Sequence, residues 1–158
     1  MSSLNIEFSL PLNFRHYAGN AGSRFLKELR DNKLIVGTKC PECKRVLVPA
    51  RPVCPRCLVA LNEFVPVSDK GTLITYTRVD HKEPVHPIPG WFIYGIIKLD
   101  GADTNLVHFI AGIDPEYVRA GMPVQAVWQE KRKGSIMDIR YFKPIGKPLV
   151  SVSGWGGT

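Results

Sequence analysis

Four cysteines carry the strongest chemical signal in the sequence. They form two C-x2-C pairs, Cys40 with Cys43 and Cys54 with Cys57, and ten residues separate the pairs. Two such turns joined by a short hairpin bring four thiolates together in the tetrahedral geometry that zinc prefers. Four sulfurs leave no open coordination position, so we expect a structural metal rather than a catalytic one. Iron suits the same sulfurs in a rubredoxin-like way, and a redox disulfide is less favoured because it needs only one C-x-x-C motif.

The basic residues are a second candidate for chemistry, because they outnumber the acidic ones by 21 to 14 and give a formal net charge of +7. Such a charge favours a nucleic-acid or phosphate-bearing partner. The excess is uneven, however: residues 15–57 carry ten Lys and Arg against three acids, whereas residues 58–128 carry five against eight. Part of the excess also surrounds the cysteines, where it offsets the charge of about −2 of an occupied cage. A uniformly basic surface for nucleic acid is therefore excluded.

A helix is expected before the cysteines. Seven apolar residues recur there at helical spacing, and Asn32-Lys33 is a suitable stop. Gly19 or Gly22 is a candidate break, which would divide the segment into two helices. The seven residues are Phe14, Tyr17, Ala18, Ala21, Phe25, Leu26 and Leu29.

Short β-like runs dominate the rest of the chain. A hairpin through residues 46–48 fits between the cysteine pairs, and five further runs are separated by Gly, Pro and Asp. These runs cover residues 71–79, 92–99, 106–113, 124–130 and 136–142. Five strands of this kind suit a small antiparallel barrel, of which the OB-fold is the commonest form at this size. The expected fold is mainly β with an N-terminal helix, in which a rubredoxin-like zinc ribbon precedes a five-stranded OB-fold barrel.

The length sets the domain organisation. A chain of 158 residues, 44% hydrophobic and 22% charged, suits one packed domain with a small metal module. We divide it into an N-terminal helical segment (residues 1–33), a zinc ribbon (34–66), an OB-fold barrel (67–146) and a C-terminal tail (147–158). The sequence has no apolar run of about 18 residues and no signal-peptide pattern, so a cytoplasmic protein without a membrane span is expected. That compartment is reducing, which favours metal over disulfides.

Six short motifs resemble one known family. The first consists of residues 29–34 followed by GTKCPEC (37–43). The other five are PARPVCPRC (49–57), GTLITYT (71–77), YGIIKLDG (94–101), AGMPV (120–124) and FKP (142–144). They resemble the rubredoxin-like zinc-ribbon plus OB-fold proteins associated with acyl-CoA metabolism, over residues 14–145. Relatives often have two prolines before the ribbon arginine where this chain has Pro49-Ala50, a departure that leaves the cysteine assignment unchanged.

The resemblance implies a non-catalytic accessory subunit that docks on a thiolase-fold catalytic subunit and helps to form its CoA or acyl-CoA passage. The small subunit of a benzoylsuccinyl-CoA thiolase, from anaerobic aromatic degradation, is the particular member it suggests. A thiolase needs a nucleophilic cysteine with a histidine to activate it, and a chain whose cysteines all bind metal has none to offer. If coenzyme A meets this chain, its phosphates need Lys or Arg. The candidates are Arg15, Arg24, Lys27, Arg30, Lys39 and Arg51.

Two other functions remain open from the sequence. An OB-fold can bind single-stranded nucleic acid by stacking bases on strand aromatics, here Tyr76, Phe92, Tyr94, Trp128, Tyr141 and Phe142. The net acidic charge of residues 58–128 makes nucleic acid an unlikely partner. A free-standing hydratase or lyase is the other alternative, but the sequence offers no paired carboxylates or His/Asp pattern for it.

Three segments outside the predicted elements also carry expectations. The Pro-rich stretch 80–91 could line a groove. Residues 130–134 are expected to be a soluble basic hairpin tip, and the tail 147–158 is expected to leave the barrel.

Overall fold

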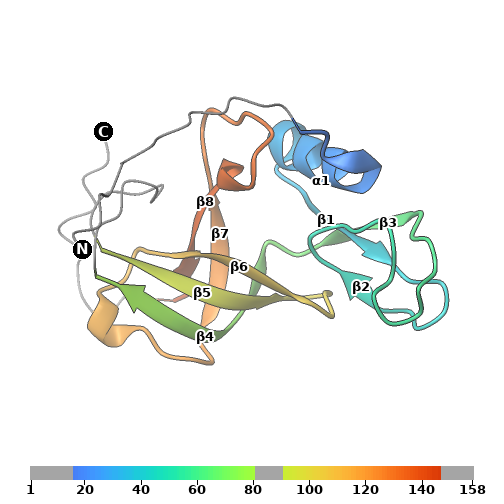
Figure 1. Cartoon of the computed structure of the whole chain (residues 1–158). Helices are drawn as coiled ribbons and strands as arrows, with labels where there is room; N and C mark the ends of the chain where they lie inside the picture. The colour runs from blue at the N-terminus through green and yellow to red at the C-terminus, as the bar shows by residue number, and fades with distance from the viewer. Residues whose placement is uncertain (1–15, 81–90, 147–158) are drawn as a thin grey trace, which may run out of the picture.

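The computed structural model describes residues 16–80 and 91–146, and in this part the chain forms one helix, a small three-stranded sheet and a closed barrel (Figure 1). The expected fold class, mainly β with an N-terminal helix, is confirmed. The predictions made for Arg15, for most of the Pro-rich stretch and for the tail 147–158 lie outside the described residues. No helix in the described ranges is long and apolar enough to cross a membrane.

The helix α1 (Gly19–Asn32) ends where the sequence predicted. Lys33 adopts a left-handed conformation with φ 52°, and its backbone N–H donates to the carbonyl of Glu28, which satisfies the last turn. The buried face consists of Ala21, Phe25 and Leu29, four residues apart, as an amphipathic helix requires. Gly22 does not interrupt the helix. Tyr17 precedes the helix and is 72% exposed, so its place on the predicted apolar face was wrong.

The loop predicted as a soluble hairpin tip holds the end of this helix. Arg132 Nε donates to the carbonyl oxygen of Arg30 at 2.7 Å, and the same guanidinium donates to the carbonyls of Gln129 and Glu130. A cation at the C-terminal end of a helix also offsets the partial negative charge of its free carbonyls. Arg132 therefore links α1 to the loop between the last two barrel strands.

The three-stranded sheet is antiparallel, with β1 (Ile35–Lys39) in the centre between β2 (Val46–Leu47) and β3 (Glu63–Val67). In β1, four of five residues are buried, since this central strand is paired on both edges and α1 packs against it. Strand β2 lies within the predicted hairpin at residues 46–48.

The barrel has five strands in the order β4-β5-β6-β8-β7, closed by pairing of β7 with β4. All neighbours are antiparallel except β6 and β8, which are parallel. The strands are β4 (Lys70–Val79), β5 (Phe92–Leu99), β6 (Asn105–Ile110), β7 (Pro123–Trp128) and β8 (Ile139–Pro144). This topology is that of the predicted OB-fold.

Most predicted strand ends agree with the structure to within about two residues. The strand predicted at residues 106–113 ends already at Ile110, and the last strand differs by as much at its start. It was predicted at residues 136–142 but begins at Ile139, because Ile136–Asp138 forms a 3-10 turn, η2. A second 3-10 turn, η1 (Pro115–Tyr117), lies between β6 and β7. Within β4 the register with β5 shifts between Leu73 and Thr75, which marks a bulge at Ile74.

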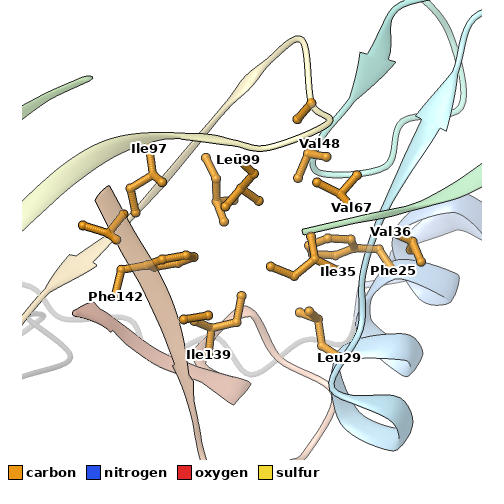
Figure 2. Packing of buried hydrophobic residues seen from close by; sticks show 14 of the residues in the cluster. Phe25, Leu29, Ile35, Val36, Val48, Val67, Ile97, Leu99, Ile139 and Phe142 are labelled. Atoms are coloured by element: carbon orange, nitrogen blue, oxygen red, sulfur yellow. The ribbon is translucent and has the colours of Figure 1, made fainter. Parts of the chain in front are cut away.

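One hydrophobic core runs through the helix, the ribbon and the barrel. Phe25 and Leu29 of α1 and Ile35 of β1 lie in the same cluster as Leu99 and Phe142 of the barrel (Figure 2). Burial of side chains of this size contributes roughly 1.5–3 kcal/mol each. The three parts therefore stabilise one another.

Polar contacts also join the ribbon to the barrel. The Asp103 backbone N–H donates to the Val46 carbonyl, and the Val46 N–H donates to Asp103 Oδ2, both at 2.8 Å. Thr104 Oγ1 accepts from the Val48 N–H at 2.7 Å and donates to the Val48 carbonyl at 2.8 Å. We call these four residues the ribbon–barrel joint. It covers the edge of β2 with the turn between β5 and β6.

Candidate metal centre and its surroundings

The four cysteines meet at one point. Their sulfur atoms all lie within 4.8 Å of one another, and Cys43 Sγ is 3.9 Å from Cys54 Sγ. Four sulfurs at the usual Zn–S distance of about 2.3 Å are about 3.8 Å apart in a tetrahedron. Cys40 and Cys54 are buried, whereas Cys43 and Cys57 are partly exposed. The donor set and its geometry therefore fit a structural zinc ion with no open position, as the sequence predicted.

The two C-x2-C turns, which we call knuckles, have the same backbone geometry. In the first, the Cys40 N–H donates to the Arg45 carbonyl at 2.9 Å and the Lys44 N–H donates to the Cys40 carbonyl at 3.0 Å. In the second, Cys54 and Leu58 make the equivalent bonds, both at 2.9 Å. The residue after each second cysteine is left-handed, with φ 62° at Lys44 and 59° at Leu58. Each knuckle thus presents its sulfurs in the same way.

The backbone of the second knuckle is arranged to hold negative charge on sulfur. Backbone N–H groups of Cys57 and Arg56 point at Cys54 and lower the pKa of that thiol to about 7. Burial, followed by the neighbouring thiols, raises the pKa of Cys57 to about 12. Since a divalent metal binds thiolates, binding releases the protons that the cluster otherwise retains.

Metal ligands make up much of the core at this end of the ribbon. The small cluster here contains Cys40, Leu47, Cys54 and Leu61, with Cys43, Cys57 and Val59 packed against it. Only three of these seven residues are ordinary apolar side chains, which is too few to hold such a hairpin without a cross-link. A metal bound by these cysteines would therefore supply the cross-link that stabilises this part of the ribbon.

The basic residues predicted for coenzyme A fall on two parts of the described structure. Arg24, Lys27 and Arg30 lie on the exposed side of α1, whereas Lys39 ends β1 and Arg51 follows the ribbon hairpin. Several are already engaged. The Arg30 guanidinium pairs with Asp31 at 2.7 Å, which raises the pKa of Arg30 and lowers that of Asp31, and Lys39 Nζ lies 4.0 Å from Glu63.

Arg24 and Lys27 are brought together by the helix. Both line an open depression of about 570 Å³ along α1, together with Glu28 and Asp31. The Arg24 guanidinium also lies over the Phe64 ring, 4.4 Å from its centroid. The depression thus has two cations and two anions on its rim, and the role of the six basic residues in phosphate binding stays a prediction.

The aromatic residues on which a nucleic-acid function depends are mostly inside the structure. Phe92 and Phe142 are fully buried, Tyr94 stacks on Phe109 with centroids 4.8 Å apart, and Trp128 packs on the core. Of the six candidates, Tyr76 alone counts as exposed, and its hydroxyl donates to the Val118 carbonyl at 2.8 Å. The described surface therefore offers few rings for base stacking.

Two buried polar residues were not identified from the sequence. His108 lies inside the barrel, where Nδ1 accepts from the Phe109 N–H at 2.9 Å and Nε2 lies 3.2 Å from the Ile136 carbonyl. Burial lowers the pKa of this imidazole. Asp138 is also buried and accepts three backbone N–H bonds, from Lys133, Gly134 and Ser135. The pattern Ser135-x-x-Asp138 is a capping-box signal that could have identified Asp138.

Comparison with known families agrees with this geometry. Residues 27–63 match the ChsH2 rubredoxin-like zinc ribbon domain, and residues 64–129 match the ChsH2 C-terminal OB-fold domain. The two matches are adjacent and together span more than half of the chain. The chain therefore belongs to the family of ChsH2-type proteins with a rubredoxin-like zinc ribbon and an OB-fold.

Three curated relatives illustrate the family. A DUF35 domain-containing scaffold protein of Pyrococcus furiosus is 30% identical over 134 residues, which cover 79% of this chain and 93% of that protein. A scaffold protein of the same description from Methanocaldococcus jannaschii is 29% identical, covering 77% and 89%. A probable enoyl-CoA hydratase alpha subunit of Thermomonospora curvata is also 29% identical, but the match covers 83% of this chain and only 39% of that protein.

Solved structures have the same architecture. The structure described as the Ltp2-ChsH2(DUF35) aldolase aligns with a TM-score of 0.60 at 26% identity, over 82% of this chain and 98% of that one. A DUF35 protein of Sulfolobus solfataricus aligns with a TM-score of 0.57 at 24% identity and agrees in fold.

Proposed function

We propose that this chain is a non-catalytic accessory subunit that docks on a thiolase-fold catalytic subunit and helps to form the passage for CoA and its thioesters. The observation that carries the proposal is the closed cage. Cys40, Cys43, Cys54 and Cys57 converge on one site, and we propose that all four cysteines of the chain bind the metal there. Acyl transfer through an enzyme thioester then needs a cysteine from another polypeptide.

The relatives support the same division of labour. Two proteins that match this chain over most of their length are described as scaffold proteins, and a third match belongs to an aldolase with a second component, Ltp2. The hydratase description belongs to a protein of which this chain covers only 39%. A scaffold that positions a catalytic partner agrees with the two scaffold proteins and the aldolase better than a free-standing hydratase does.

For the CoA passage we propose that Arg24 and Lys27 meet phosphate oxygens, because α1 brings these two cations to one depression. Arg30 and Lys39 are weaker candidates since each has an acidic neighbour. In the assembled complex, Arg24→Gln with Lys27→Gln should weaken CoA binding about tenfold in isothermal titration. Lys98→Gln, an exposed change on the barrel, is the matched control. Equal affinity for all three would remove the phosphate role from α1.

We propose further that the acyl group is an aromatic one and that the complex is of the benzoylsuccinyl-CoA thiolase type. This rests on the Gly-rich residues 153–158, which resemble those of the members that serve thiolases of anaerobic aromatic degradation. Assay of the purified complex with benzoylsuccinyl-CoA and with acetoacetyl-CoA, each in the presence of free CoA, tests it. Turnover of the aliphatic thioester alone would contradict the aromatic assignment and leave the accessory role intact.

The central experiment is a gentle affinity purification of the tagged chain from its native host, with metal analysis of the same sample. We expect about one zinc per chain and a thiolase-fold chain with a reactive cysteine in fixed ratio. Iron in place of zinc would change the metal but not the role. A chain that elutes alone would contradict the proposal, and so would tight, salt-sensitive binding of a labelled oligonucleotide in fluorescence anisotropy. We also propose that the complex works in the cytoplasm, where thiols stay reduced.

A further inference from the structure

Leu58 stands out on the surface of the ribbon. Its side chain is 80% exposed, more than any other large apolar side chain in the described residues. It also occupies a left-handed backbone position, φ 59°, which a branched apolar residue adopts reluctantly. An isolated exposed leucine is ordinary, so the residue becomes informative only through its surroundings.

The first knuckle shows that the fold does not need a leucine here. Lys44 holds the equivalent position, with φ 62° and the same backbone hydrogen bond to the first cysteine of its pair. Its Nζ donates to the Pro41 carbonyl at 2.5 Å, so this residue has a local role and a solvated head. Leu58 has the same backbone task but places an apolar side chain in water. Its identity therefore has a reason outside the knuckle.

Other apolar residues of the same hairpin are exposed as well. Val53 is 46% exposed and pairs across the hairpin with Ala60, which places the two side chains on one face. Ala60 and Pro52 are also exposed. We call Pro52, Val53, Leu58 and Ala60 the ribbon tip. Val53 and Ala60 share one face, and Leu58 lies two residues before Ala60 on the same hairpin, whose shape is held by the two hydrogen bonds that Cys54 makes with Val59 and Leu58.

The charges around the ribbon tip indicate what it meets. Residues 51–62 contain Arg51 and Arg56 and no acidic residue. Both arginines are exposed, and neither takes part in the ion pairs formed within residues 16–80 and 91–146. An apolar anchor flanked by free guanidinium groups is complementary to an apolar pocket with carboxylates on its rim.

We propose that the ribbon tip is the anchor by which this chain docks on its catalytic subunit, with Leu58 inserted into an apolar pocket that is rimmed by Asp or Glu. This inference rests on the proposed function, since that function supplies the partner. A second copy of this chain suits the tip less well. A two-fold contact would place Arg51 and Arg56 opposite their own copies, which repel one another.

The test compares three chains, each mixed with the purified catalytic subunit from the native complex. Leu58→Lys should lower the affinity at least tenfold in biolayer interferometry, because a lysine cannot fill an apolar pocket. Lys44→Gln, the matched change on the other knuckle, should alter it less than threefold. Arg51→Gln with Arg56→Gln should slow association and flatten its salt dependence.

Folding and docking are separated within the same set of variants. Lys is already accommodated at the equivalent backbone position, so Leu58→Lys should retain one metal per chain and the wild-type melting temperature. Affinity within threefold of wild type for Leu58→Lys would overturn the inference while leaving the accessory role standing. A wild-type chain that recruits no catalytic subunit overturns both. A dimer of the isolated chain in light scattering that Leu58→Lys dissociates would assign the tip to a second copy instead.

Discussion

His108 makes the stability of the barrel dependent on pH. Burial holds the pKa of this imidazole below its ordinary value, and the Phe109 and Phe142 rings lie beside it, each with centroids 5.7 Å away. Below about pH 6.5 the unfolded chain takes up a proton at this residue that the folded chain refuses, so the contribution is present above that pH and is lost as the pH falls. We expect the melting temperature of wild type to fall relative to His108→Gln between pH 7.5 and 5.5.

The free energy of unfolding of wild type relative to His108→Gln cannot change by more than about 1.4 kcal/mol per pH unit, since one proton is involved. Acid release of the metal affects both proteins alike, and taking the difference removes it. Parallel curves for wild type and variant would show that folding does not lower the pKa of His108.

Asp138 is expected to be costly to replace. Its carboxylate accepts the backbone N–H groups of Lys133, Gly134 and Ser135 at 2.9, 2.7 and 3.2 Å. Asp138→Ala leaves these donors without their acceptor at a buried site and should lower the free energy of unfolding by about 2–4 kcal/mol in urea titration. Ser135→Ala removes a single acceptor, that of the Met137 N–H, and should cost about 1 kcal/mol. Equal losses would contradict this account.

At the scale of residues, the sequence predicted what spacing alone determines. A short hairpin between two C-x2-C pairs brings their four sulfur atoms close together, so the cysteine cage was predictable. His108 and Arg132 were not, because their roles depend on carbonyl groups of Ile136 and Arg30, which lie far away in the chain. Such partners become visible only when the barrel is closed.

At the scale of elements, the ribbon should depend on its metal more than the barrel does. Four of the seven residues in the small hydrophobic cluster around the metal site are cysteines, whereas the main core is built from residues of α1, β1, β3 and the barrel. Treatment with a strong chelator should therefore abolish protection from hydrogen exchange at residues 40–61 while β5 and β6 stay protected. Restored protection after zinc addition is the control. Simultaneous loss in ribbon and barrel would show that one cooperative unit holds both.

The strands were largely predictable because β-branched runs between turn residues carry a local signal. The prediction failed at residues 136–138, where Ser135 and Asp138 close a 3-10 turn and delay β8 by three residues. It also placed Tyr17 on the apolar face of a helix that begins only at Gly19. At the start of β8 the hydrogen bonds between Ser135 and Asp138 decide the end of the element, and hydrophobic spacing does not detect such bonds.

At the scale of the molecule, Thr104 joins the barrel to the ribbon. Its hydroxyl serves both polar groups of the Val48 backbone, at 2.7 and 2.8 Å. Thr104→Val keeps the shape but leaves both groups without that partner, and it should lower the free energy of unfolding by about 1–3 kcal/mol. Thr75→Val, on an exposed part of β4, is the matched control and should change it by less than about 0.5 kcal/mol. A similar effect of both would contradict a special role of the joint.

The joint has a consequence for any complex that contains this chain. Hydrogen bonds from the main-chain N–H groups of Val46 and Val48 to the side chains of Asp103 and Thr104, together with a shared core, fix the ribbon against the barrel, so the two ends cannot move independently. Such a molecule works as a spacer of constant length, which transmits position without transmitting movement. Whatever holds the ribbon determines where the barrel lies, and in the proposed complex any rearrangement during a reaction cycle takes place in the catalytic subunit.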